Sequence, residues 1–290
     1  MHSTDLIAKE IEYAIDDFFH ILVRLTHLLK GKSQLILLQC ILSTMDLKRK
    51  IREAVPQKYI FKLLHIKKSL PFFGGAALKS YSGNGEDIIL LHYLFKNKRN
   101  GVYVDVGAFH PKIISNTYQL HKLGWTGINI DPNPQSIELF KKYRKEDVNL
   151  QLGISEKKEM KTYYNFSYSG ANTFDKEFAK AKTEKSWNTL LSKEQIECLP
   201  LSEILDMHLT PNNKKIDLLD VDVEGLDLHV LKSNTWNKYR PSVILAEDKE
   251  FRKNPGGSEV YKFLEEKGYK FHSYMDITLI MVEKNFNPNS

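Results

Sequence analysis

Residues 101–132, GVYVDVGAFHPKIISNTYQLHKLGWTGINIDP, decide the fold of this 290-residue chain. The stretch opens with β-branched and aromatic residues and then reaches Gly107, which predicts a strand followed by a sharp turn. A helix is predicted over about 115–123, and a second strand at 127–130 ends on Asp131. Two parallel strands joined by a crossover helix place both strand ends on one edge of the sheet, where α/β folds bind ligands.

The turn after the first strand lacks the glycines that hold a phosphate. A dinucleotide site needs G-x-G-x-x-G, whereas residues 105–111 read DVGAFHP, with one glycine and an acid at the head. Asp131, about 20 residues further on, is placed to accept hydrogen bonds from a ribose diol. The acids favour S-adenosylmethionine, which carries a ribose diol, a sulfonium and an ammonium but no phosphate. The alternative is an ordinary strand-helix-strand unit whose acids are only solvated.

The composition is that of a globular protein. Hydrophobic residues make up 42% of the chain, the formal net charge is +6 and the pI is about 9.0. Lysines and arginines are scattered between acids, so we expect no nucleic-acid partner. Cys40 and Cys198 form no metal or redox motif and indicate a reducing compartment. Acidic residues crowd the N-terminus and the apolar segment 18–29 is too short to span a bilayer, so we expect a cytoplasmic protein.

Residues 1–70 are predicted to form a helical appendage. Apolar residues recur at helical spacing from Ile7 to Leu22, and a second helical run follows a short break. We expect the appendage to pack on the rest of the chain or to form a homodimer interface. The Lys-rich segment 48–68 keeps contact with a membrane surface as the alternative. A linker beginning at Pro71 opens the second predicted domain, residues 71–290.

The second domain alternates strands with helices. Further strands are predicted at 148–152, 215–223, 241–246, 269–274 and 278–282. This rhythm predicts a doubly wound, mostly parallel α/β sheet that an antiparallel hairpin closes. An insertion at about 167–197 interrupts it. Such insertions form lids or substrate pockets, and the alternative is a surface loop.

Six patches follow one another in this domain. They are YSGNGED at 81–87, VDVGA at 104–108 with SNT at 115–117, GINIDP at 127–132, GIS at 153–155, DVDVEG at 220–225 and the segment 240–247. Together they resemble the FkbM-type S-adenosylmethionine-dependent methyltransferases over about residues 80–283. The sequence departs from that family at Gly83, where glutamine is expected, so a contact from that side chain is not carried over.

The resemblance implies a class I methyltransferase fold and methylation of a hydroxyl oxygen. The implied acceptor is a sugar, nucleotide sugar or glycan precursor of the kind found in capsule or O-antigen. It also implies cofactor contacts from Asp105, Gly107 and Ala108 at the amino-acid and ribose end, from Asp131 at the ribose hydroxyls and from Ile154 near adenine, with Ser115, Asn116 and Thr117 completing the pocket.

Three carboxylates are predicted to meet where two later strands end, namely Asp222, Glu247 and Asp248. Like charges this close repel each other, so a neutralising group is needed. A magnesium or manganese ion takes oxygen ligands and would acidify a sugar hydroxyl. The alternative is a metal-free site with Asp222 or a histidine, His110 or His229, as general base. We take Asp222, Glu247 and His110 as the candidate catalytic residues.

Two rival functions follow from the same residues. A nucleotide-sugar oxidoreductase would also use Asp131 to bind a ribose diol. It needs, however, the glycine-rich turn that binds phosphate, which this sequence lacks. A non-catalytic methyltransferase-like binding scaffold is the second rival, and the set of Asp105, Gly107 and Asp131 argues against it. A nucleic-acid methyltransferase is disfavoured, because DVEG at 222–225 stands where an N-P-P-Y-type motif is expected.

Overall fold

The computed structural model describes residues 78–96, 98–183, 188–209 and 215–288. The chain divides into two compact units, Met1–Leu78 and Lys79–Ser290. The predicted helical appendage and Cys40 lie outside the described residues. None of the helices within the described ranges is long and apolar enough to cross a membrane.

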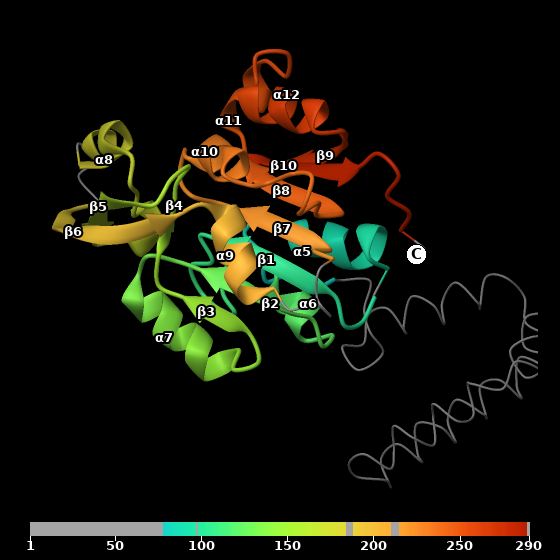
Figure 1. Ribbon diagram of the computed structural model, residues 1–290, viewed down its shortest axis with the longest axis horizontal. Helices are drawn as coiled ribbons and strands as arrows, with labels where there is room; N and C mark the ends of the chain where they lie inside the picture. Colours follow the sequence, from blue (N-terminus) through green and yellow to red (C-terminus); the bar gives the residue numbers. More distant parts are fainter. Residues whose placement is uncertain (1–77, 97, 184–187, 210–214, 289–290) are drawn as a thin grey trace, which may run out of the picture. The chain divides into compact units, whose positions relative to one another are not determined.

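The second unit is built on a seven-stranded sheet in the order β3-β2-β1-β7-β8-β10-β9 (Figure 1). The strands are β1 (Val102–Val106), β2 (Thr126–Ile130), β3 (Val148–Leu150), β7 (Leu218–Val221), β8 (Val243–Glu247), β9 (Tyr269–Met275) and β10 (Thr278–Glu283). β1 pairs in parallel with both β2 and β7, so the strand order reverses beside it. β10 is antiparallel to both β8 and β9. The predicted doubly wound sheet with its closing hairpin is confirmed.

Helices cover both faces of this sheet. They are α5 (Glu86–Ile89), η2 (Leu90–Leu94), α6 (Tyr118–His121), α7 (Pro134–Tyr143), α9 (Leu201–His208), α10 (Asp227–Lys232), α11 (Lys249–Lys253) and α12 (Glu259–Glu266). Val104 and Leu219 face a core with α9, α10 and α12, whereas Tyr103 and Leu218 face a core with η2 and α6. Central strands covered on both faces read as continuous apolar runs, which made them recognisable in the sequence.

The helices of the second unit differ in part from the predicted ones. The helix expected over 115–123 shrinks to α6, four residues long. Helix α12 begins after Ser258, whose hydroxyl accepts the N–H of Tyr261 at 2.9 Å. The short helix α11 was not predicted, and Asp248 caps its first turn.

Residues 153–199 form a second, three-stranded sheet in the order β4-β6-β5. Its elements are β4 (Gly153–Ile154), β5 (Glu159–Phe166), η3 (Ser169–Ala171), α8 (Lys176–Thr183) and β6 (Leu190–Leu199). We call residues 159–199 the arm; in Figure 1 β5, β6 and α8 stand at one side of the main sheet. β6 was not predicted, because most of its residues are exposed and lack alternation. Its long antiparallel ladder with β5 defines it instead.

Candidate functional site

The turn after β1 is held by the loop that follows β7. Gly107 has a φ of +81°, and its N–H donates to the carbonyl of Ile130 at 2.9 Å. A Cβ at this position would lie 1.8 Å from the backbone oxygen of Asp222. Ala108 is buried and also donates its N–H to Ile130. Glycine is therefore required because two loops meet here, which brings the ends of β1 and β7 together.

We expect Gly107→Ala to destabilise the protein more than Gly225→Ala. Both positions have positive φ, which costs a residue with a Cβ about 1–2 kcal/mol. A Cβ at Gly225 meets nothing within 4 Å, so that variant is the matched control. The clash at Gly107 should add about 1–3 kcal/mol in urea unfolding. Equal losses in the two variants would contradict the close packing of the loops.

Asp131 follows β2 and keeps acceptor capacity for a ligand. Its Oδ2 accepts the N–H of Phe109 at 2.8 Å and its Oδ1 accepts the N–H of Asn133 at 2.8 Å. A carboxylate offers about four acceptor positions, so about two remain for the paired hydroxyls of a ribose. Burial raises the pKa of Asp131 to about 6, with the two N–H groups opposing the rise. The group is still mostly ionised at pH 7.

A buried arginine organises the loop between β1 and α6. Arg144 is 0% exposed and donates to the hydroxyls of Ser115 and Thr117, each at 2.8 Å, and to the carbonyl of Pro111 at 2.7 Å. Thr117 in turn donates to Asp105 at 2.6 Å. Ser115 and Thr117, expected to complete the cofactor pocket, thus bond to Arg144 and Asp105 beneath the loop. Sequence reasoning missed Arg144, which lies among exposed lysines.

Two carboxyl groups lie side by side on β1 and β7. Asp105 and Asp220 are neighbours in the strand register, and both are buried. Burial raises the pKa of Asp105 while its bond to Thr117 opposes the rise. Burial and then the charge of Asp105 raise the pKa of Asp220 well above its usual range. Asn116 donates to Asp220 at 3.2 Å, so it binds this acid within the protein.

A small, mainly apolar cavity opens beside the turn. Gly107 and Ile154, both predicted to contact the cofactor, line it together with Val106, Ile130, Pro132, Leu152, Gly153, Phe174, Val223, Leu226 and Val230. The cavity joins the ends of β1 and β2 to β4 and α10. Its walls suit a flat apolar group, and the lining residues Ile130 and Pro132 flank Asp131 in the chain.

The ends of β7 and β8 carry an acidic cluster with one lysine. Lys249 Nζ lies 2.8 Å from Glu247 Oε1 and 3.9 Å from Glu224 Oε2. The side chain of Asp222 reaches solvent but is crowded by protein atoms. The resulting loss of hydration, followed by repulsion from Glu247 and Glu224, raises the pKa of Asp222 to about 7. Burial lowers the pKa of Lys249, but its bond to Glu247 and the nearby acids outweigh this and leave that pKa raised.

The three carboxylates predicted to bind a metal do not meet. Asp248 caps α11 by accepting the N–H of Phe251 at 3.0 Å, and its other oxygen accepts the hydroxyl of Ser258. No group of three or more histidine, cysteine or acidic residues in the described ranges is arranged to hold a metal. Lys249 instead supplies the countercharge to Glu247. The described residues therefore give no support to the prediction that Asp222, Glu247 and Asp248 form a magnesium or manganese site.

Asp227 is an acid of this cluster that sequence reasoning missed. It is 2% exposed, and its Oδ1 accepts the N–H of Glu247 at 2.9 Å. Burial, then the charges of Asp222 and Glu247, raise the pKa of Asp227 well above its usual range. Asp227 holds the end of β8 through this hydrogen bond. The acids Glu224 and Glu247, which the sequence places at the ends of the same two strands, were the available signal.

The structure gives both candidate histidines local partners. His110 Nδ1 accepts the N–H groups of Lys112 and Ile113 at 3.0 and 3.1 Å, which closes the loop after Gly107. Burial lowers the pKa of His110. His229 is exposed and pairs with Glu156 at 2.8 Å. The structure thus brings Asp222 and Glu247 together and places His110 in the loop after Gly107.

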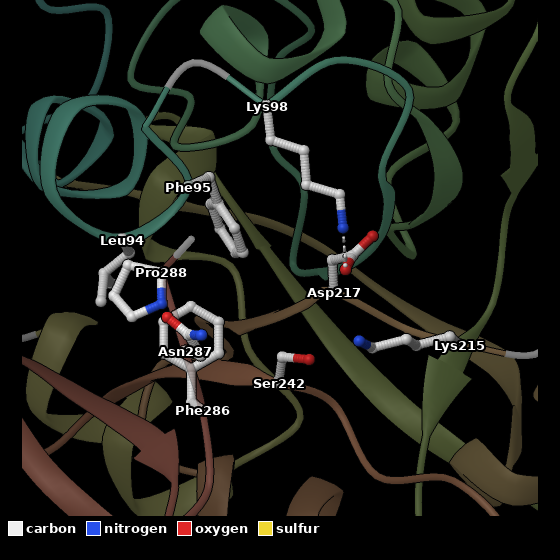
Figure 2. Close-up of a pocket in the computed structure, with 9 residues that line it drawn as sticks. All are labelled: Leu94, Phe95, Lys98, Lys215, Asp217, Ser242, Phe286, Asn287 and Pro288. Carbon is white, nitrogen blue, oxygen red and sulfur yellow. Dashed lines mark hydrogen bonds and ion pairs between the residues drawn. The ribbon is translucent and has the colours of Figure 1, made fainter. Parts of the chain in front are cut away.

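A second small cavity lies at the opposite edge of the main sheet (Figure 2). It adjoins Asp217 and Ser242, which immediately precede β7 and β8. Figure 2 shows the Lys98 ammonium directed at the Asp217 carboxylate, with an N–O distance of 2.8 Å. Asp217 also accepts the N–H of Val102 at 3.0 Å. This cluster ties the strand beginnings together and lies far from the acids at the other edge.

Comparison with known proteins identifies a family. The family model for the methyltransferase FkbM domain matches residues 105–271. No curated protein matches the sequence. Two solved structures show some similarity to the chain. Methyltransferase FkbM from Methylobacillus flagellatus KT has a TM-score of 0.37 and 11% identity over 74% of this chain and 47% of its own. Precorrin-6y C5,15-methyltransferase from Geobacter metallireducens GS-15 has a TM-score of 0.35 and 13% identity over 72% and 94%.

The extent of these matches differs. The chain spans about half the length of the M. flagellatus protein. The family model, in contrast, matches more than half of the 290 residues and includes both the turn at Gly107 and the acids at Asp222 and Glu247. The chain therefore belongs to the FkbM methyltransferase family.

Proposed function

We propose that the protein is an S-adenosylmethionine-dependent O-methyltransferase that acts on a hydroxyl of a sugar or glycan precursor. The observation that carries this proposal is Asp131, an ionised acid with free acceptor positions beside a turn with a single glycine. This arrangement suits a ribose diol and provides no cradle for a pyrophosphate. It therefore supports an adenosyl cofactor over the dinucleotide of an oxidoreductase.

The residues around the turn fit the cofactor part by part. Asp131 binds the ribose hydroxyls, and the apolar cavity at Ile154 takes the adenine. The acids Asp105 and Asp220 lie behind the turn and favour the cationic amino-acid end. When bound, the cofactor supplies an electrophilic methyl group on a sulfonium.

Asp222 is the proposed general base. Its side chain reaches solvent at the carboxyl end of β7, and its pKa of about 7 suits a group that takes up a proton near neutral pH. The acceptor oxygen forms a bond to the methyl carbon as the carbon–sulfur bond breaks, and Asp222 accepts the hydroxyl proton. Glu247 is held by Lys249 at 2.8 Å, so the pair serves as a fixed donor and acceptor for a second hydroxyl.

The acceptor is inferred from the same cluster. Carboxylates and an ammonium at short distances from one another match a compound with several neighbouring hydroxyls, such as a sugar, free or nucleotide-linked. The proposed mechanism includes no divalent cation, because the ammonium of Lys249 balances the charge of Glu247.

We expect Asp131→Ala to weaken binding of S-adenosylhomocysteine by about 10–100-fold, because it removes hydrogen bonds to a charged acceptor worth about 1.5–3 kcal/mol. Isothermal titration calorimetry measures this. Asp276→Ala, an exposed acid paired with Arg252, is the matched control and should bind normally. Wild-type binding of NAD alone would favour an oxidoreductase, and no nucleotide binding at all would favour a scaffold.

A further inference from the structure

A phenylalanine of the arm forms one wall of the cavity beside the turn. The other lining residues belong to the main sheet, its loops, β4 and α10, whereas Phe174 lies between η3 and α8. The inserted segment thus reaches the cavity with an aromatic ring. The cavity is incomplete without it.

The backbone of β4 leaves room for this ring. A Cβ on Gly153 would lie 2.6 Å from Cζ of Phe174 and 2.6 Å from Sγ of Cys198, closer than side-chain atoms pack. Glycine at this position therefore lets the ring lie directly against the strand. Ile154, the next residue, lines the same cavity.

The ring of Phe174 packs against another aromatic ring, and hydrogen bonds hold the residues just before and just after it in the chain. Tyr163 is buried, and its ring lies 4.8 Å from that of Phe174 at an angle of 46°. Before the ring, the carbonyl of Thr173 accepts the N–H of Tyr164 at 2.9 Å. After it, Asp175 accepts the N–H of Phe178 at 2.9 Å at the start of α8. The position of the ring is therefore fixed before a ligand arrives.

The ring of Phe174 lies across the cavity from the chain around the proposed ribose-binding acid. Ile130 and Pro132, the residues on either side of Asp131, line the same cavity as Phe174. In an adenosyl group the adenine is attached directly to the ribose. A ribose bound at Asp131 therefore places the adenine within reach of Phe174 and Ile154.

We propose that Phe174 stacks on the adenine of the cofactor, so that the arm is part of the cofactor site. This inference rests on the proposed function. Stacking of a base on an aromatic side chain leads us to expect about tenfold weaker binding of S-adenosylhomocysteine when the ring is lost.

The test is calorimetric titration of the full chain with S-adenosylhomocysteine. Phe174→Leu keeps an apolar side chain but removes the ring, and it should bind about tenfold more weakly. Phe174→Trp keeps a ring and should bind close to wild type. Tyr164→Leu makes the same kind of change at the neighbour of Tyr163 in the small core of the arm, and it should leave the affinity unchanged.

Hydrogen exchange separates stacking on the ligand from a purely structural role of Phe174, because it measures how much the ligand protects the amides of the arm. S-adenosylhomocysteine should protect the amides of β5 and β6 in the wild type and Phe174→Trp but not in Phe174→Leu. Equal affinity and equal protection in the wild type and Phe174→Leu would overturn the inference while leaving the proposed function intact. A wild type that binds no S-adenosylhomocysteine would instead refute the proposed function, and the inference with it.

Discussion

Replacing Asp222 with asparagine should lower kcat by about 10²–10⁴-fold, the range by which a positioned general base accelerates proton transfer. Asparagine keeps the shape of the side chain but cannot take up the hydroxyl proton. The wild-type kcat should also depend on pH. The base works only when ionised, and its pKa is about 7, so kcat should be half-maximal near pH 7, level off about one unit above it and fall about tenfold per unit well below it.

The measurement uses a panel of nucleotide-activated sugars as acceptors and detects the methylated product. Asp276→Asn, which changes an exposed acid paired with Arg252, is the matched control and should keep the wild-type rate and pH profile. Carboxyl NMR gives an acceptor-free check, because a group titrating near pH 7 should disappear in Asp222→Asn. If Asp222→Asn still loses activity below pH 7 as the wild type does, the general base is Glu247 or another group.

Replacing Arg144 with methionine should destabilise the protein by about 3–5 kcal/mol, as expected when one partner of a buried charged network is removed. The change takes five hydrogen bonds from the loop and from Tyr103. It also removes the positive charge that acts on the buried acid Asp105. Urea unfolding followed by the fluorescence of buried Trp125 measures the loss.

Arg252→Met is the control for this prediction. Arg252 is exposed and pairs with Asp276 at 3.2 Å, and surface pairs of this kind contribute about 0–1 kcal/mol. The difference between the two variants isolates the effect of burial. If Arg144→Met unfolds at the same urea concentration as Arg252→Met, the network around Asp105 does not hold the loop as described.

The main sheet was predictable because its signals are local. Central strands such as β1 and β7 are apolar on both faces, and each ends in a glycine or an acid, so their place and direction follow from the residues themselves. The arm gave a weaker signal. β6 has few apolar residues, and only its partner β5 makes it a strand.

The candidate site also has a part that the sequence predicted and a part that it did not. The position of Asp131 relative to Gly107 follows from the strand-helix-strand pattern, and Ile154 lines the same cavity as Gly107. Which acids would meet at β7 and β8 did not follow from the pattern. Asp248 looked equivalent to Glu247, but the first turn of an unpredicted helix uses it as a cap.

The sequence by itself determined where the strands of the main sheet lie along the chain and the edge at which the acids of the site gather, because side-chain periodicity and turn residues act over a few neighbours. Only the tertiary structure decided the partner of each charge. Arg144 beneath the loop after Gly107, Lys249 near Glu224 and Phe174 across from Ile154 all lie far along the chain from the residues that they contact or face. Their roles arise because a buried charge or an open cavity must be satisfied by whatever the fold brings near it.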